Sequence, residues 1–181
     1  QSGKSPGYRR AAAGEEPVGK KTQRASATPA TLALERAGVQ FEAMGYEHDP
    51  RVTAYGREAA EALGLPPQCV FKTLVVQTDH DGFGVCVVPV AQSADLKAVA
   101  VALGAKKARL ADPGEVQRLT GYVLGGVSPL GQRPRLPTVI DDGARRLDRM
   151  YVSGGRRGQD VGLAPRDLAE LTGAVFAAIA R

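Results

Sequence analysis

Apolar and polar residues follow two different periods from Thr28 onward, which indicates helices interleaved with strands. Thr28 followed by Pro29 is typical of a helix start, and Gly38 is typical of its end. Residues 39–46 then alternate between apolar and polar side chains and predict a strand. A short helix over residues 57–63 follows, because a glycine comes directly after its last apolar position.

Two valine-rich runs at 71–77 and 83–89 predict a β-hairpin, since the Asp-His-Asp-Gly sequence between them favours a tight turn. Ser93 is predicted to cap a helix that ends at Leu103. Asp112 is followed by a proline and then a glutamate, a sequence resembling a capping box. The remaining predictions are strands at 122–127, 138–141 and 150–152 and a helix at 165–171, with residues 174–181 ambiguous.

Helices and strands that interleave around a tight hairpin predict an α/β protein with a mixed sheet rather than a purely parallel one. The length of 181 residues favours one domain. Residues 1–27 are basic, rich in Gly, Ser and Ala, and have no apolar periodicity. We therefore expect 1–27 to be a flexible basic extension and 28–181 to be the folded domain.

Charge along the chain argues against strong nucleic-acid binding by the folded domain itself. The net charge is +5, but residues 1–27 hold six bases and two acids, and the other 18 bases and 17 acids leave only +1. Phosphate contacts dominate nucleic-acid affinity, so we expect weak intrinsic binding. Two cysteines exclude a disulfide scaffold, and no apolar run approaches the roughly 20 residues of a membrane span. A reduced, cytoplasmic protein without membrane contact is predicted.

Three glycine-bearing segments and Lys72 stand out as candidates for chemistry. The Tyr55-Gly56 pair is a weak signal by itself, and each of the others has a plain structural alternative. The glycine-bearing segment 121–131 would let backbone N–H groups approach a ligand, or would simply form a tight turn. Segment 153–158 carries two arginines between glycines, which suits either a phosphate or a solvated turn. Lys72 begins an otherwise apolar strand, where its ammonium either extends to water or has a function.

No conventional catalytic or metal-binding arrangement can be assembled from the remaining residues. No Cys/His cluster has zinc spacing. His80 is expected to be solvated in its turn and His48 to lie on the surface. Cys86 is expected in the core, and Cys69 has no partnered base. The patterns alone leave the function open.

Several motifs together resemble the YbaK/EbsC family, the free-standing relatives of the prolyl-tRNA synthetase editing domain. The resemblance covers nearly all of the chain from Thr28 to Arg181. Its motifs are YEHDP at 46–50, FKTL at 71–74, AKK at 105–107, ADP at 111–113, TGY at 120–122, GGVSPLG at 125–131, RLP at 135–137 and YVSGG at 151–155. The resemblance implies the YbaK-like fold, a mixed and mostly antiparallel sheet flanked by helices.

The resemblance also implies an activity: trans-editing removal of cysteine from mischarged Cys-tRNA(Pro), with no cofactor and no metal. By resemblance Lys72 is the catalytic residue. The family is thought to let the substrate's own thiol attack the ester and expel the tRNA as a thiolactone, which explains the missing nucleophile. The resemblance places seven further residues at the substrate, and for Tyr55 only the ring is carried over: Tyr46, Tyr55, Gly125, Gly126, Pro129, Ser153 and Asp160.

The predicted partners are the aminoacyl 3′ end of a mischarged tRNA and, by resemblance, prolyl-tRNA synthetase. Two alternatives remain open. One is deacylation of Ala-tRNA(Pro) or another small aminoacyl-tRNA, because small side chains differ by only about 1–3 kcal/mol in a hydrophobic pocket. The other is a non-catalytic module that binds tRNA or the synthetase; a Lys72→Ala variant that binds tRNA without deacylating it would exclude this second alternative.

Overall fold

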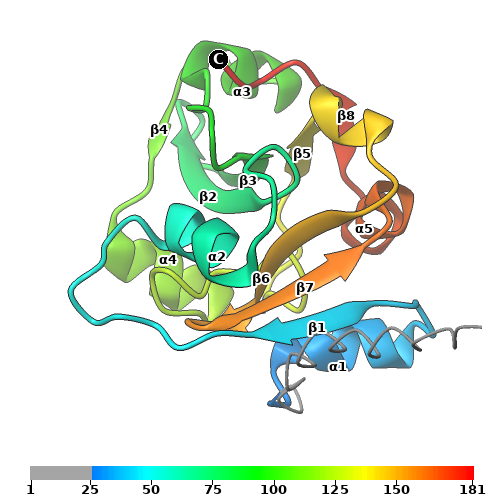
Figure 1. Cartoon of the computed structure of the whole chain (residues 1–181). Coiled ribbons are helices and arrows are strands. Elements are labelled where there is room, and N and C mark those ends of the chain that lie inside the picture. Colours follow the sequence, from blue (N-terminus) through cyan, green and yellow to red (C-terminus); the bar gives the residue numbers. More distant parts are fainter. Residues whose placement is uncertain (1–25) are drawn as a thin grey trace, which may run out of the picture.

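The computed structural model describes residues 26–181, which form helices packed on two β-sheets (Figure 1). The helices are α1 (Pro29–Arg36), α2 (Tyr55–Leu63), α3 (Leu96–Ala102), α4 (Pro113–Thr120) and α5 (Pro165–Thr172), with a 3-10 helix η1 (Asp142–Arg146). The strands are β1 (Glu42–Gly45), β2 (Phe71–Thr78), β3 (Phe83–Pro89), β4 (Ala108–Leu110), β5 (Thr138–Asp141), β6 (Met150–Arg156), β7 (Gln159–Leu163) and β8 (Val175–Ala177).

The smaller sheet has the order β1-β7-β6 and is antiparallel throughout, whereas the larger has the order β4-β2-β3-β5-β8. In the larger sheet β4, β2 and β3 are antiparallel, and β5 runs parallel to both β3 and β8. The α/β class and the mostly antiparallel pairing predicted from the sequence are confirmed, although the strands form two sheets and not one.

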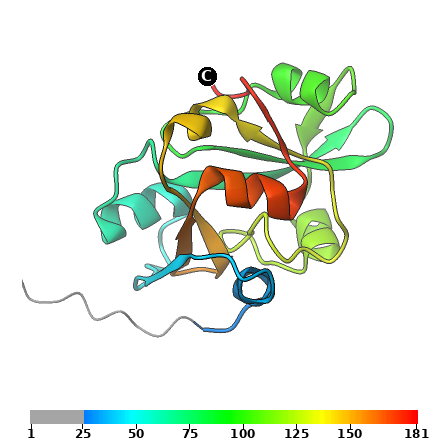
Figure 2. The same cartoon turned by 90° about the vertical axis from the view of Figure 1, so that its right-hand side faces the viewer.

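The main hydrophobic core lies between the two sheets. It joins apolar side chains of β2 and β3 to those of β6 and β7, and includes Leu34 of α1 and Leu168 of α5. A second cluster lies under α3 on the other face of the larger sheet and contains Val88 and Val99. Because both faces of β2 and β3 are buried, these strands are valine-rich without clean alternation. Figure 2 shows α5 across the middle of one side of the molecule, with α3 above it and α1 below.

Most predicted elements are present with shifted ends. Thr28 caps α1 in a capping box, its Oγ1 accepting from the backbone N–H of Thr31 and its own N–H donating to the Thr31 Oγ1. Helix α2 begins at Tyr55, two residues earlier than predicted, and the first strand is confined to Glu42–Gly45. Sequence reasoning missed β4 and β7 because both are short and lack an alternating pattern.

Three local predictions are wrong. Residues 122–127 contain a turn at Leu124 and Gly125 and no strand, because the φ of 84° at Gly125 lies outside the range of regular strands. Helix α3 is capped by Asp95, whose carboxylate accepts two backbone N–H groups, while the backbone of Ser93 pairs with Arg181 instead. Asp112 precedes α4 as predicted, but its side chain makes no capping hydrogen bond.

Residues 1–25 of the predicted extension lie outside the described residues, and its last two residues, 26 and 27, lie within them. Ser26 is in contact with β7: its N–H donates to Gln159 Oε1 and its carbonyl accepts from Gln159 Nε2, each at 3.1 Å. Its hydroxyl also accepts from Arg156 at 2.7 Å. None of the helices in the described region is long and apolar enough to cross a membrane.

Candidate active site

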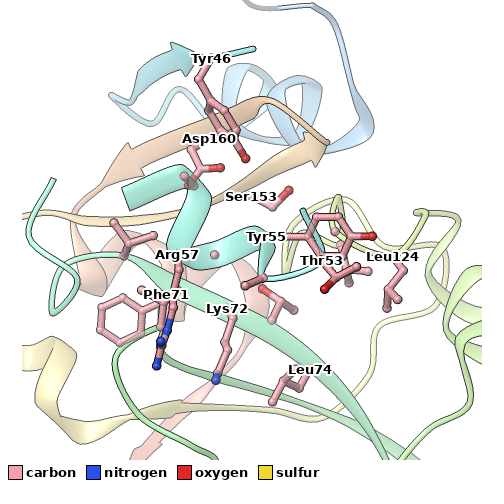
Figure 3. Close-up of a pocket in the computed structure, with 18 residues that line it drawn as sticks. Tyr46, Thr53, Tyr55, Arg57, Phe71, Lys72, Leu74, Leu124, Ser153 and Asp160 are labelled. Atoms are coloured by element: carbon pink, nitrogen blue, oxygen red, sulfur yellow. The ribbon is translucent and has the colours of Figure 1, made fainter. Parts of the chain in front are cut away.

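A cavity of about 360 Å³ lies where the start of α2, the start of β2 and the glycine segment after α4 meet the smaller sheet (Figure 3). This volume is at the lower end of the range of small-molecule sites and suits an aminoacyl group. The lining is mostly apolar, with a few polar side chains that converge on the space. The cavity wall includes Tyr46, Tyr55, Arg57, Lys72, Leu124, Gly125, Ser153 and Asp160.

Lys72 is partly buried on β2 and lines this cavity. Side chains of a strand alternate between its faces, so Lys72, Leu74 and Val76 share one face. Leu74 and Val76 pack in the cluster under α3, whereas the chain of Lys72 lies beside the start of α2. Burial lowers the pKa of its ammonium, and the charge of Arg57 lowers it further. The cation is therefore held in a partly dehydrated site, where its field on a neighbouring oxyanion is strong.

Tyr46, Ser153 and Asp160 form the polar end of the cavity. Antiparallel pairing of β6 with β7 sets Ser153 opposite Asp160. Tyr46 follows β1, and its backbone N–H donates to the carbonyl of Gly158 at 2.8 Å. Asp160 is only 5% exposed and has no ion-pair partner among the described residues. Burial raises its pKa to about 7, and burial together with the Asp160 charge raises the pKa of Tyr46 to about 12.

A contact between the first residue of α2 and the glycine segment closes one side of the cavity. Gly125 has φ 84°, and a Cβ placed there would lie 2.6 Å from the ring of Tyr55. Gly126 also has no room for a side chain, because a Cβ placed there would lie 2.9 Å from the Cα of Arg156. Only glycine allows this segment to lie against both the aromatic ring and the turn that follows β6.

Figure 3 shows oxygen-bearing side chains at one end of the cavity and cationic side chains at the other. The oxygen atoms of Tyr46, Ser153 and Asp160 gather at one end, and the nitrogen-bearing tips of Lys72 and Arg57 lie at the other. A ligand that spans the cavity would therefore meet hydrogen-bond acceptors at one end and cations at the other. An amino acid esterified through its carboxyl group carries this polarity, with an ammonium on one side and a polar carbonyl on the other.

The structure brings six of the eight sequence-predicted site residues to the cavity wall: Tyr46, Tyr55, Lys72, Gly125, Ser153 and Asp160. The other two, Gly126 and Pro129, are buried in the segment behind the wall. Sequence reasoning missed Arg57 and Leu124, which line the cavity, because an exposed arginine and a leucine carry no motif of their own. It also missed Thr73, whose Oγ1 is the one buried side-chain oxygen or nitrogen without a hydrogen-bond partner in the described region.

His48 was expected on the surface, and this prediction is wrong. Its Nδ1 lies 2.7 Å from Glu58 Oε2, and its side chain is only 15% exposed. The other oxygen of Glu58 accepts the backbone N–H of Asp49 at 2.7 Å. This carboxylate thus ties the loop after β1 to the first turn of α2, and the His48 ring lies 5.6 Å from that of Tyr55.

Cys86 and His80 are placed as predicted. Cys86 is fully buried in the cluster under α3, and burial raises the pKa of its thiol to about 12, so the thiol stays protonated. His80 is exposed in the turn of the hairpin.

Within residues 26–181, no three His, Cys, Asp or Glu side chains are grouped so that they could hold a metal ion.

Residues 48–171 match the model of a family described as the aminoacyl-tRNA editing domain. This match spans more than half of the chain and contains the cavity residues from Tyr55 to Asp160. The chain belongs to this family.

Curated relatives of this editing-domain chain point the same way. A relative from Enterococcus faecalis, provisionally named Cys-tRNA(Pro)/Cys-tRNA(Cys) deacylase EbsC, is 38% identical over 120 residues, 66% of this chain and 73% of the relative. A relative from Escherichia coli, the multifunctional Ser/Thr-tRNA deacylase ProXp-y, is 29% identical over 138 residues, 74% of this chain and 80% of the relative.

A solved structure described as a candidate trans-editing enzyme for prolyl tRNA synthetase superimposes on the editing-domain chain with a TM-score of 0.72. It is 28% identical, and the alignment covers 87% of this chain and 99% of that one. Together with the family match, these relatives confirm the family, the fold and the aminoacyl-tRNA deacylase class that were predicted from the sequence.

Proposed function

We propose that this protein is a trans-editing deacylase that removes cysteine from mischarged Cys-tRNA(Pro), with Lys72 as its catalytic residue. The observation that carries the proposal is the partly buried ammonium of Lys72 in the same cavity as Gly125, with a polar end opposite. The name of the Enterococcus faecalis relative supports cysteine as the amino acid.

The two ends of the cavity orient the aminoacyl group. The α-ammonium lies at the polar end beside Asp160, because a buried carboxyl group without an ion-pair partner favours a cation. The ester carbonyl then lies towards Lys72, whose ammonium stabilises the negative charge that develops on the carbonyl oxygen. Desolvation keeps this interaction strong, since less water competes for the charge.

The chemical step needs no enzyme nucleophile. The substrate thiol attacks the ester carbonyl carbon, so a C–S bond forms and the C–O bond to the terminal ribose breaks. The thiol proton ends on the released ribose hydroxyl, and the cysteine leaves as a thiolactone that water later opens. Holding thiol and carbonyl in one small cavity supplies the proximity that such an intramolecular reaction requires.

A second candidate substrate is a small amino acid without a thiol, such as alanine or serine. The Escherichia coli relative is named a Ser/Thr-tRNA deacylase, and the polar end of the cavity offers hydrogen-bond partners to a hydroxyl side chain. In that case a water molecule would replace the thiol as nucleophile. The two candidates differ in whether turnover requires sulfur.

The test is a deacylation assay with proline tRNA charged with cysteine, alanine or serine. We expect cysteine to be removed fastest and Lys72→Ala to lower that rate by about 100-fold or more, the usual cost of losing one donor to an oxyanion. Lys97→Ala is the matched control, because Lys97 is an exposed lysine on α3. Equal rates for cysteine and alanine would exclude the thiol mechanism, and full activity of Lys72→Ala would exclude the site.

A further inference from the structure

Arg157 lies at the rim of the cavity and has no part in the chemistry proposed above. Its Nε donates to the carbonyl of Leu124 at 2.8 Å, and its guanidinium carbon lies 5.1 Å from the centre of the Tyr55 ring. Leu124 and Tyr55 both line the cavity and lie side by side on one flank of it in Figure 3. Arg157 therefore stands just outside the wall, on the side of the glycine segment.

The guanidinium of Arg157 keeps most of its donors free. An arginine offers five N–H donors in a rigid plane, and only the Nε group of Arg157 has a partner in the described part of the chain. Arg51, Arg118 and Arg149, in contrast, each pair with a carboxylate. The ring contact and the Leu124 bond fix the plane of Arg157, so a ligand would find its free donors already oriented.

We propose that Arg157 binds a phosphate of the tRNA 3′ end while the aminoacyl group occupies the cavity. This inference rests on the proposed function. An amino acid bound between Asp160 and Lys72 is esterified to the terminal ribose, so the sugar and its phosphates remain at the mouth of the cavity. A guanidinium plane matches two phosphate oxygens, and no carboxylate of residues 26–181 forms an ion pair with Arg157. The near-neutral charge of residues 28–181 makes one such oriented contact more important than overall attraction.

The first test measures binding of a fluorescent single-stranded RNA that ends in CCA, over a range of salt concentrations. Loss of one phosphate contact makes the slope of log K against log salt shallower by about 0.7 for a single strand. We expect this change for Arg157→Gln and not for Arg166→Gln. Arg166 is the matched control because it is an exposed arginine on α5, paired with Glu170. An unchanged slope for Arg157→Gln would overturn the proposal.

A second readout separates binding of phosphate from support of the glycine segment. With Cys-tRNA(Pro), we expect Arg157→Gln to raise KM about 10-fold, the worth of a hydrogen bond to a charged group, and to change kcat far less. Arg157→Lys keeps the charge but loses the plane, so it should restore the salt slope and only part of the affinity. A fall in kcat at constant KM would show that Arg157 supports the glycine segment instead, and would also overturn the proposal.

The two proposals can fail independently. If the wild-type protein deacylates no tested tRNA, the proposed function fails, but the RNA-binding slope still decides whether Arg157 contacts phosphate. If deacylation is normal and the slope of Arg157→Gln equals that of the wild type, only the inference about Arg157 fails.

Discussion

The pKa of an acidic side chain in this domain depends on its neighbours more than on its residue type. Asp160 and Asp49 are both carboxylates, but Asp49 pairs with Arg51 in solvent, while Asp160 is buried and forms no ion pair with any residue of 26–181. The Arg51 hydrogen bonds lower the pKa of Asp49, and burial raises the pKa of Asp160 to about 7. The sequence marks both residues only as acids, so their different protonation could not be predicted from it.

The raised pKa of Asp160 predicts a pH-dependent stability. Its folded pKa lies above the unfolded value, so its protonation stabilises the fold fully below about pH 4, and this contribution is lost as the pH rises through 7. We expect Asp160→Asn to be more stable than the wild type at pH 8, by a few kcal/mol in order of magnitude, and to lose this advantage below about pH 4.

Urea unfolding of both proteins at several pH values measures this difference. A gap in the free energy of unfolding that stays constant from pH 4 to pH 8 would mean that Asp160 does not change its protonation in this range.

At the scale of elements, the sequence predicted those that follow a clear period or carry a cap. Helix α1 with Thr28 and the valine-rich hairpin are examples, and Lys72 could be placed on the hairpin's first strand. The segment 122–127 was mistaken for a strand because its residues are apolar, whereas its contact with the Tyr55 ring decides its path. Long-range contacts of this kind leave no periodic trace in the chain.

The glycine segment provides an element-scale prediction. In Gly125→Ala the new methyl group meets the Tyr55 ring at 2.6 Å and sits on a backbone with φ 84°. We expect it to lower both the stability and the deacylation rate. The matched control is Gly104→Ala, which has φ 76° but nothing within 4 Å of the new Cβ, so it should carry only the backbone cost of about 1 kcal/mol.

Thermal unfolding and deacylation assays of the two variants separate backbone strain from the clash with Tyr55. Equal losses of stability and activity in Gly125→Ala and Gly104→Ala would show that the contact with the ring is unimportant.

At the scale of the whole molecule, the packing of the two sheets forms one cavity from segments that are far apart in the sequence. Lys72 comes from the larger sheet, Ser153 and Asp160 from the smaller, and Tyr55 from the helix that starts beside both. Sequence motifs identified these residues one by one, but only the packing of the sheets sets them around one space. Arg157 is one of the two arginines that the sequence set beside either a phosphate or a solvated turn. It lies in the turn between β6 and β7, and its place at the rim of the cavity follows only from this packing.

The near-neutral charge of the domain predicts that tRNA selection depends on a partner, which we propose to be prolyl-tRNA synthetase. We expect the purified protein to deacylate Cys-tRNA(Pro) and another cysteine-charged tRNA at similar rates at physiological salt, because few phosphate contacts are available. Adding the synthetase should favour the proline tRNA. A strong preference shown by the protein alone would contradict this dependence.

The opposed ends of the cavity have a consequence for ongoing translation. A tRNA that carries a growing polypeptide has its amino nitrogen locked in a peptide bond, which holds no positive charge. In the proposed orientation such a nitrogen would leave the carboxyl group of Asp160 without a counter-ion. The protein would therefore not deacylate peptidyl-tRNA, whereas a mischarged tRNA with a free amino group would still be a substrate.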